Sequence, residues 1–415
     1  MEIKRDRYLN RLIARKWNGS VKVITGLRRC GKSYLLFKLF RDHLISDGVR
    51  PENIISIALD DIRNRQLRDP DVLYNAVVDS ITGGEHYVLL DEIQYIDGFE
   101  DVINGFRHIP HLDIYVTGSN SKMLSRDILT EFRGRGDEVR VHPLSFSEFS
   151  SAFSGTVDDA WNSYCIFGGL PELFGRRDDE QKTSYLQNLM QEVYLKDLVE
   201  HNDIRLTNEL GMMTDLLCSS VGSLTNPLKI SNTLKTVGKS RINEETVSRY
   251  LNFMEDSFLF ERSKRYDIKG KKYFETPSKY YVADIGLRNA RLNFRQQEET
   301  HIMENILYNE LRARGFSVDV GVVEARTTKG GNSEFKQLEI DFVANRGDRR
   351  YYIQCAYRMF EGEKKEQELR PFHKVGDSFK KIMIVGDDIR RKMDDNGVVT
   401  IGIKEFLLND NAIDL

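Results

Sequence analysis

The sequence predicts an α/β fold for the first 150 residues, because apolar strand-like runs alternate there with helical or irregular segments. The runs lie near residues 21–25, 54–59, 87–91, 113–117 and 138–142. Strands joined by such crossovers pair in parallel and are buried on both faces. We therefore expect a parallel sheet covered by helices on both sides.

The strand near residues 21–25 runs directly into a glycine-rich phosphate-binding motif. Residues 26–33 read GLRRCGKS, which fits the pattern G-x-x-x-x-G-K-S, and a helical segment follows at once. In this pattern backbone N–H groups and the helix N-terminus surround phosphates, the lysine reaches the outer phosphates, and the serine hydroxyl binds Mg²⁺. The sequence therefore predicts a nucleoside triphosphate and Mg²⁺ at this loop. The predicted nucleotide-binding residues are Gly26, Leu27, Arg28, Arg29, Cys30, Gly31, Lys32, Ser33 and Tyr34.

A pair of carboxylates follows the third strand. The run Tyr87-Val88-Leu89-Leu90 ends in Asp91-Glu92, as expected of a buried parallel strand whose C-terminal end opens on a ligand. At this spacing from the phosphate loop, we expect Asp91 to organise Mg²⁺ together with Ser33. We expect Glu92 to orient and deprotonate the attacking water.

Two further elements of a hydrolytic site are expected downstream. The fourth strand ends in Gly118-Ser119-Asn120-Ser121, and a polar side chain there would contact the γ-phosphate or the water, Asn120 being favoured over Ser119. The alternative is an ordinary turn. Arg133 or Arg135 is a candidate arginine finger, since guanidinium stabilises charge on a transferring phosphoryl group. Such a finger acts either within its own chain or on a neighbouring subunit, and the second case requires a homo-oligomer. The alternative is a solvated basic loop.

Length and composition indicate several soluble domains. The chain has 415 residues, 40% hydrophobic and 30% charged, with a net charge of −3. It contains no apolar run near the ~20 residues that span a bilayer and no signal-peptide core at the N-terminus. Its four cysteines form no paired motif, and we expect a cytoplasmic protein with no membrane partner.

The middle of the chain is predicted to be helical and then to resemble a winged helix. Two helical segments around a turn at Gly238 are followed by a hairpin around Gly270 that is rich in basic and aromatic residues. The basic residues are Arg262, Lys264, Arg265, Lys269, Lys271 and Lys272. Such a surface suits DNA phosphates, but winged helices also contact proteins, so both interpretations stay open.

The last third resembles the restriction-endonuclease-like fold. A helix carrying Glu304 precedes three strands, and Asp341 lies on the second of them. In that fold carboxylates at these positions bind Mg²⁺, and a Glu-x-Lys motif lies on the next strand. Here Gln354 and Ala356 replace that pair, so we expect a degenerate, non-cleaving domain unless Lys336 or another residue substitutes.

Taken together, these motifs resemble those of archaeal and bacterial AAA-type ATPases. The resemblance rests on residues 26–33, Leu90-Asp91-Glu92-Ile93-Gln94, residues 117–121, Phe132-Arg133-Gly134-Arg135, residues 143–149 and Gly168-Gly169-Leu170-Pro171. It implies ATP as the nucleotide and a sheet in the order 5-1-4-3-2. The expected domains are a P-loop domain (1–150), a helical segment (151–215), a winged-helix-like domain (216–285) and a nuclease-like domain (286–415).

Three functions are compatible with this organisation: an ATP-hydrolysing switch or motor acting on DNA, an ATP-regulated nuclease, and a nucleotide-organised scaffold without catalysis. Glu92 argues against the scaffold, because a pure binding module needs no base beside the Mg²⁺ ligand.

Overall fold

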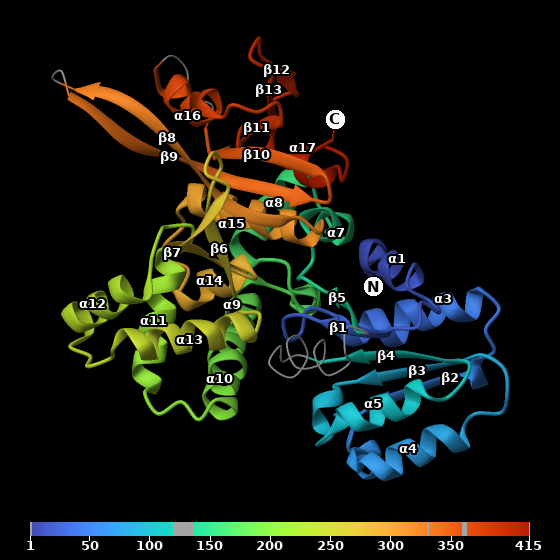
Figure 1. The fold of residues 1–415 in the computed structure, drawn as a ribbon. Helices are drawn as coiled ribbons and strands as arrows, with labels where there is room; N and C mark the ends of the chain where they lie inside the picture. Colours follow the sequence, from blue (N-terminus) through green and yellow to red (C-terminus); the bar gives the residue numbers. More distant parts are fainter. Residues whose placement is uncertain (1, 119–135, 330–331, 359–362, 415) are drawn as a thin grey trace. The chain divides into compact units, whose positions relative to one another are not determined.

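The structure is a computed structural model that describes residues 2–118, 136–329, 332–358 and 363–414 (Figure 1). Its internal contacts divide the chain into two compact units. Unit 1 comprises Met1–Pro143 with Asp256–Phe258, and unit 2 comprises Leu144–Glu255 with Leu259–Leu415. No helix in the described ranges is long and apolar enough to cross a lipid bilayer.

Unit 1 is built on a five-stranded parallel sheet in the order β2-β3-β4-β1-β5. This confirms the predicted parallel sheet and the order 5-1-4-3-2, counted from the opposite edge. The strands are β1 (Val21–Thr25), β2 (Ile54–Ala58), β3 (His86–Asp91), β4 (Leu112–Thr117) and β5 (Gly136–Arg140). Every residue of β1 and β3 is buried, which is why these strands read as continuous apolar runs.

Helices cover both faces of this sheet (Figure 1). Val21, Val23, Val88 and Val116 pack against α4 and α5 in one hydrophobic core. The alternate residues of the same strands face α1 and the continuous helix α2–η1–α3, where Phe40 packs on Tyr115. The helical elements are α1 (Asp6–Ile13), α2 (Lys32–Tyr34), the π-helix η1 (Leu35–Phe40), α3 (Arg41–Ser46), η2 (Pro51–Asn53), η3 (Ile62–Arg68), α4 (Pro70–Asp79), η4 (Ile93–Tyr95) and α5 (Phe99–Arg107).

Unit 2 begins with helices, as the sequence pattern predicts. Several start with a side-chain cap; Ser145 and Glu148, for example, form a reciprocal capping box at the start of α7. The elements are α7 (Phe146–Ala152), α8 (Val157–Phe167), η6 (Pro171–Gly175), α9 (Asp179–Asn188), the π-helix η7 (Leu189–Leu195), α10 (Lys196–His201), α11 (Thr207–Ser219), α12 (Pro227–Gly238) and α13 (Glu244–Asp256).

The second sheet has eight strands in the order β12-β13-β11-β10-β9-β8-β6-β7. It is mixed, with parallel pairing at β6–β8, β10–β11 and β11–β13. The strands are β6 (Phe260–Asp267), β7 (Lys272–Val282), β8 (Ser317–Lys329), β9 (Asn332–Arg346), β10 (Arg349–Ala356), β11 (Lys380–Val385), β12 (Lys392–Met393) and β13 (Val398–Gly402). The hairpin β6–β7, which we expected to form a wing, therefore belongs to the same sheet as the C-terminal strands.

Two helices cover opposite faces of this sheet (Figure 1). From α15 (Glu299–Ala313), Tyr308 stacks on Tyr281 of β7 with ring centroids 4.1 Å apart. From α16 (Glu363–Lys374), Leu369 and Phe372 join the core on the other face. The remaining helices are α14 (Ile285–Arg291) and α17 (Ile403–Leu408).

The Gly168-Gly169 pair lies against a buried aspartate at the start of α14. Asp284 accepts hydrogen bonds from the backbone N–H groups of Gly169 (2.7 Å) and Gly286 (2.9 Å). A Cβ at Gly168 would lie 2.1 Å from the Asp284 Oδ1 atom, so only glycine fits there. Burial raises the pKa of Asp284 to about 6, although these backbone hydrogen bonds oppose the shift.

We predict a stability change with pH that depends on Asp284. Because its pKa is raised on folding, the contribution of Asp284 to the free energy of unfolding is highest below about pH 4 and falls by ~3 kcal/mol as the pH rises through about 6. Asp284→Asn removes this dependence, since asparagine does not ionise. Thermal unfolding of both proteins between pH 4 and 7 measures the difference, and parallel curves would contradict the assignment.

Candidate active site

Glycine is required at both ends of the phosphate-binding loop. Gly26 adopts a φ of 133°, and a Cβ there would lie 2.0 Å from the Val141 carbonyl oxygen. Gly31 adopts a φ of 98° and immediately precedes α2. Other residues rarely adopt these angles. The loop therefore connects the end of β1 to a helix N-terminus, where exposed N–H groups favour anions.

The Lys32 side chain is folded into the loop. Its ammonium donates hydrogen bonds to the carbonyl oxygens of Gly26 (3.0 Å) and Leu27 (3.1 Å), and the residue is 4% exposed. A cation held by neutral carbonyls is available to a more strongly attracting phosphate, because a charged partner forms the stronger hydrogen bond. Lys32 is thus placed for phosphate binding.

The phosphate-binding loop is held in place by residues that the sequence analysis did not identify. Arg5 Nη1 donates to the Cys30 carbonyl oxygen (3.0 Å), and Arg5 Nη2 donates to the His142 carbonyl oxygen (2.6 Å). The Cys30 thiol is fully buried and lies 3.3 Å from the Val141 carbonyl oxygen. The small, buried Cys30 side chain therefore fills space in the packed interior. Arg28 and Tyr34 are half-buried and Arg29 is exposed, so these three line the outer side of the loop region.

Asp91 lies at the end of β3 and brings the loop and the sheet together. It is 3% exposed and accepts a hydrogen bond from the Thr117 hydroxyl group. Burial raises its pKa, while the bonds from Thr117 and Ser33 act in the opposite direction. Ser33 and Asp91, the two residues predicted to bind Mg²⁺, are thus near enough for the Ser33 side chain to lower the pKa of Asp91.

Glu92 follows in a left-handed backbone conformation with φ 55° and ψ 52°. Its N–H donates to the Thr117 Oγ1 atom at 3.0 Å, and its carboxylate accepts a hydrogen bond from Gln94 Nε2. Thr117 thus links the Asp91 carboxylate to the backbone of Glu92 through a single hydroxyl. Sequence analysis did not single out Thr117, whose signal was a threonine at the end of β4. The expected contact of Asn120 or Ser119 with the γ-phosphate stays a prediction.

The donor set suits a Mg²⁺ ion that is shared with phosphates. The described residues contain no group of three or more His, Cys, Asp or Glu side chains that could hold a metal ion by themselves. Mg²⁺ in nucleotide sites takes only one or two protein oxygens and completes its shell with phosphate and water. Ser33 and Asp91 fit that requirement. Asn120, Ser119, Arg133 and Arg135 lie outside the described residues.

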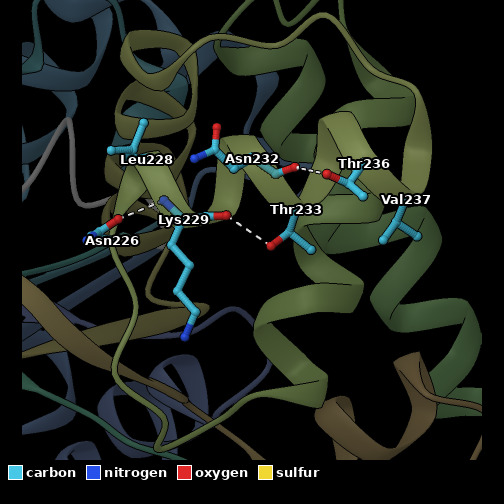
Figure 2. A pocket seen from close by; sticks show the side chains of 7 residues that line it. All are labelled: Asn226, Leu228, Lys229, Asn232, Thr233, Thr236 and Val237. Atoms are coloured by element: carbon cyan, nitrogen blue, oxygen red, sulfur yellow. Dashed lines mark hydrogen bonds between the residues drawn. The ribbon is translucent and has the colours of Figure 1, made fainter.

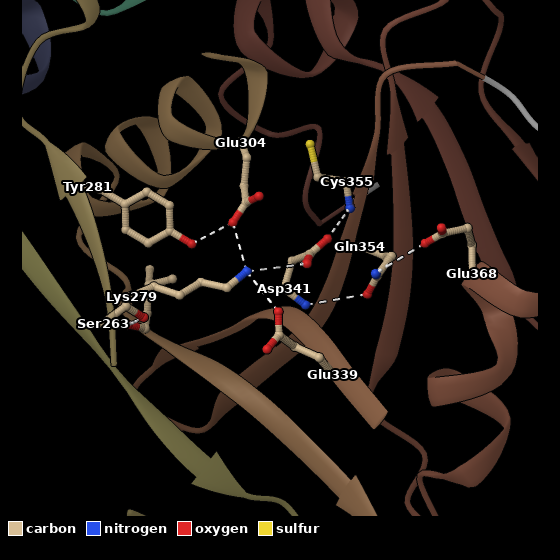
Figure 3. Close-up of polar contacts among 10 residues, drawn as sticks. Ser263, Lys279, Tyr281, Glu304, Glu339, Asp341, Gln354, Cys355 and Glu368 are labelled. Carbon is tan, nitrogen blue, oxygen red and sulfur yellow. Dashed lines mark hydrogen bonds and ion pairs between the residues drawn. The ribbon is translucent and has the colours of Figure 1, made fainter. Parts of the chain in front are cut away.

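The C-terminal candidate residues also come together in part. Glu304 and Asp341 both contact Lys279, a residue that sequence analysis did not assign to this site (Figure 3). Gln354 and Ala356 lie on β10 as predicted, and Lys336 is exposed.

A hollow open to solvent lies on α12 (Figure 2). The Thr233 and Thr236 hydroxyls donate to the carbonyl oxygens of Lys229 (2.9 Å) and Asn232 (2.9 Å), so they serve the helix itself. Its lining residues are Asn226, Leu228, Lys229, Asn232, Thr233, Thr236 and Val237. We assign no function to it.

Comparison with known proteins supports the interpretation of unit 1. Residues 18–150 match the family described as AAA domain, and residues 158–298 match a domain of unknown function (DUF8612). An uncharacterized protein of Haemophilus influenzae is 33% identical over 413 residues, covering 98% of both chains. The uncharacterized protein MJ1544 of Methanocaldococcus jannaschii is 29% identical over 389 residues, covering 90% of this chain and 82% of that one.

One solved structure has a similar fold over most of the chain. It is the Walker-type ATPase of Pyrococcus abyssi, with a TM-score of 0.50 and 16% sequence identity. The match covers 70% of this chain and 96% of that protein. At this identity the likeness concerns the fold alone.

Proposed function

Because this chain belongs to the AAA-type P-loop ATPases, we propose that it binds ATP with Mg²⁺ and hydrolyses it at the site formed by the loop 26–33 and the end of β3. The observation that carries the proposal is the buried Asp91 carboxylate, which accepts a hydrogen bond from Thr117 and whose charged form is favoured by Ser33 of the phosphate loop. Asp91 thus brings the phosphate loop and the acidic strand end together, with Glu92 beside it.

Each residue has a role in this proposal. Lys32 binds the outer phosphates, while Ser33 and Asp91 hold Mg²⁺, which when bound offsets phosphate charge. Glu92 accepts a proton from the water whose oxygen attacks the γ-phosphorus, as the bond to the β-phosphate oxygen breaks and ADP leaves. Two further roles stay predictions: Asn120 as the γ-phosphate sensor, and Arg133 or Arg135 as the arginine finger.

Steady-state phosphate release tests the proposal. The unaltered protein is expected to hydrolyse ATP when Mg²⁺ is present and to stop when EDTA removes the metal. Neither Ser33 nor Asp91 carries a positive charge that could offset the phosphates. Measuring the rate per subunit against protein concentration adds the oligomeric state, since a finger in trans makes the rate rise with concentration. ATP binding without turnover at any concentration would favour the scaffold function instead.

Thr117 gives a finer prediction about the same site. In Thr117→Val the shape is kept, but Asp91 loses a donor and the Glu92 N–H loses its acceptor. We expect turnover to fall ~10- to 100-fold, in line with ~1–3 kcal/mol for an unsatisfied buried group. The bond from Thr117 lowers the pKa of Asp91, so its loss raises that pKa and moves the acid limb of the pH–rate profile upward. Thr117→Ser is the control and should restore both; equal rates for the serine and valine variants would contradict the role.

The exposed lysines of the β6–β7 hairpin favour a second function, binding of a nucleic-acid backbone. Lys264, Lys269, Lys271 and Lys272 are all exposed on this hairpin. Arg265, by contrast, is engaged with Gln337 through a hydrogen bond of 2.8 Å. Exposed lysines suit phosphate contacts without reading base sequence. We propose DNA as the partner on this ground.

A salt titration of DNA binding tests this partner. The double variant Lys271→Gln/Lys272→Gln is expected to reduce the slope of log affinity against log salt by about 2, because each phosphate contact contributes ~0.9. The matched control Lys16→Gln/Lys38→Gln removes the same charge from unit 1 and should leave the slope unchanged. Binding that does not depend on salt would assign the hairpin to a protein contact.

A further inference from the structure

Three carboxylates surround one lysine in unit 2 (Figure 3). Lys279 Nζ lies 2.9 Å from Glu304 Oε1, 2.9 Å from Glu339 Oε1 and 3.7 Å from Asp341 Oδ1. The Lys279 side chain is only 4% exposed. We call these four residues the Lys279 cluster.

The fold holds the cluster from three elements. Lys279 comes from β7, Glu304 from α15, and Glu339 and Asp341 from β9, so the cluster joins the edge strand β7 and the inner strand β9 to the helix that covers the sheet. Two of the carboxylates accept further hydrogen bonds. Tyr281 donates its hydroxyl proton to Glu304 Oε1 (2.7 Å), and the Cys355 N–H donates to Asp341 Oδ2 (2.8 Å).

Lys279 stays charged in this environment. Burial alone would lower its pKa, but the charges of Glu304, Asp341 and Glu339 outweigh burial and raise it above the ordinary lysine value. The same burial raises the pKa of Asp341 to about 7, although Lys279 opposes that shift. The three carboxylates outnumber the single ammonium, and the charges of Glu304 and Glu339 add to the raised pKa of Asp341.

A divalent cation does not fit among these residues as they stand. The fold that this region resembles places a metal between the carboxylates at the Glu304 and Asp341 positions, and here the ammonium lies between them. Gln354, at the next ligand position, turns its amide to the Asp341 N–H (3.4 Å) and to Glu368 (3.4 Å). Ala356 offers no oxygen. Mg²⁺ and Ca²⁺ need carboxylate oxygens at about 2.0–2.6 Å, which a resident ammonium at hydrogen-bond distance from the same oxygens prevents.

We propose that Lys279 takes the place of a divalent cation in this cluster. Unit 2 then keeps the side-chain arrangement of a metal site, but the site is an ion-pair cluster that binds no metal. This inference is independent of the proposed ATPase activity. It implies that unit 2 does not cleave nucleic acids with metal-activated water. It also implies that removing the ammonium uncovers a cation site.

The experiment is a Mn²⁺ titration without nucleotide, followed by equilibrium binding and by thermal unfolding. The unaltered protein and Asp341→Asn are expected to bind Mn²⁺ equally, because the Asp341 carboxylate holds no metal in the unaltered protein. Lys279→Met is expected to bind Mn²⁺ at least about tenfold more tightly than the full-length protein, since a positive charge has left the centre of three carboxylates. Mn²⁺ should raise the unfolding midpoint of this variant only, and Lys279→Met/Asp341→Asn should lose the effect.

The comparison of the unaltered protein with Asp341→Asn needs no folded lysine variant. Mn²⁺ binding that falls in Asp341→Asn, or DNA cleavage with Mn²⁺ that Asp341→Asn abolishes, would overturn the proposal. Glu339→Gln serves as a milder second variant, because this carboxylate is 35% exposed and its loss is easier to tolerate. A folded Lys279→Met that gains no Mn²⁺ site would also overturn it, since the cluster would then lack the arrangement of a metal site.

Discussion

Replacing Glu92 by glutamine is expected to abolish turnover while leaving ATP binding intact. Glutamine keeps the size of the side chain and its oxygen, and so preserves the hydrogen bond from Gln94. It cannot accept the proton of the attacking water. Loss of a general base costs about 10²- to 10⁴-fold in rate. Phosphate release and ATP binding, measured on the same preparation, separate the two effects.

Lys32→Ala is the matched comparison for that experiment. It removes the ammonium that lies inside the loop, so we expect the loss of ATP binding itself. The two variants should therefore fail at different steps. If Glu92→Gln hydrolyses ATP at the rate of the unaltered protein, the base is another residue, and the assignment of Glu92 is wrong while nucleotide binding stands.

Asp113→Asn is expected to lower the free energy of unfolding of unit 1 by about 3–5 kcal/mol. Lys22 on β1 is fully buried, and its ammonium pairs with Asp113 on β4. Asp113 also accepts hydrogen bonds from the Tyr115 hydroxyl (3.0 Å) and the Trp17 N–H (3.1 Å). Burial already lowers the pKa of Lys22, and the charge of Asp113 opposes this. Asparagine keeps the acceptor oxygen but leaves the ammonium without a counter-charge.

Urea unfolding of this variant is best compared with Asp47→Asn. That substitution breaks another lysine–aspartate pair, Lys16–Asp47, in which the aspartate is 53% exposed. Exposed pairs contribute about 0–1 kcal/mol, so the control should unfold almost as the unaltered protein does. Equal losses in the two variants would show that burial of the Lys22–Asp113 pair is not what makes it important.

The sequence predicted the features whose structure depends on residues close together in the chain. The phosphate loop and Asp91-Glu92 could be recognised because each is a short run whose backbone and chemistry are set by neighbouring residues. Strand alternation likewise predicted the parallel sheet of unit 1. The strand order depends on pairing between strands that lie far apart in the sequence. It was expected only from the family resemblance, and the structure confirms it.

Residues that act across long sequence separations were not predictable in this way. Arg5 bonds to His142, and Lys279 bonds to carboxylates on α15 and β9. In the sequence each is a single basic residue among many, with nothing nearby to mark its partner. The extent of β8 and β9 also escaped prediction. Their pairing continues to Lys329 and Asn332, well beyond the apolar stretches near residues 316–320 and 338–344 that identified them.

The strand order of unit 1 has a consequence for synthesis on the ribosome. β1 is made first, yet both of its neighbours, β4 and β5, are made much later. Until β5 has left the ribosome, β1 presents an unpaired and largely apolar edge to any other chain. A fragment that stops before residue 136 is therefore expected to aggregate, and a nascent chain of that length is a natural client for chaperones.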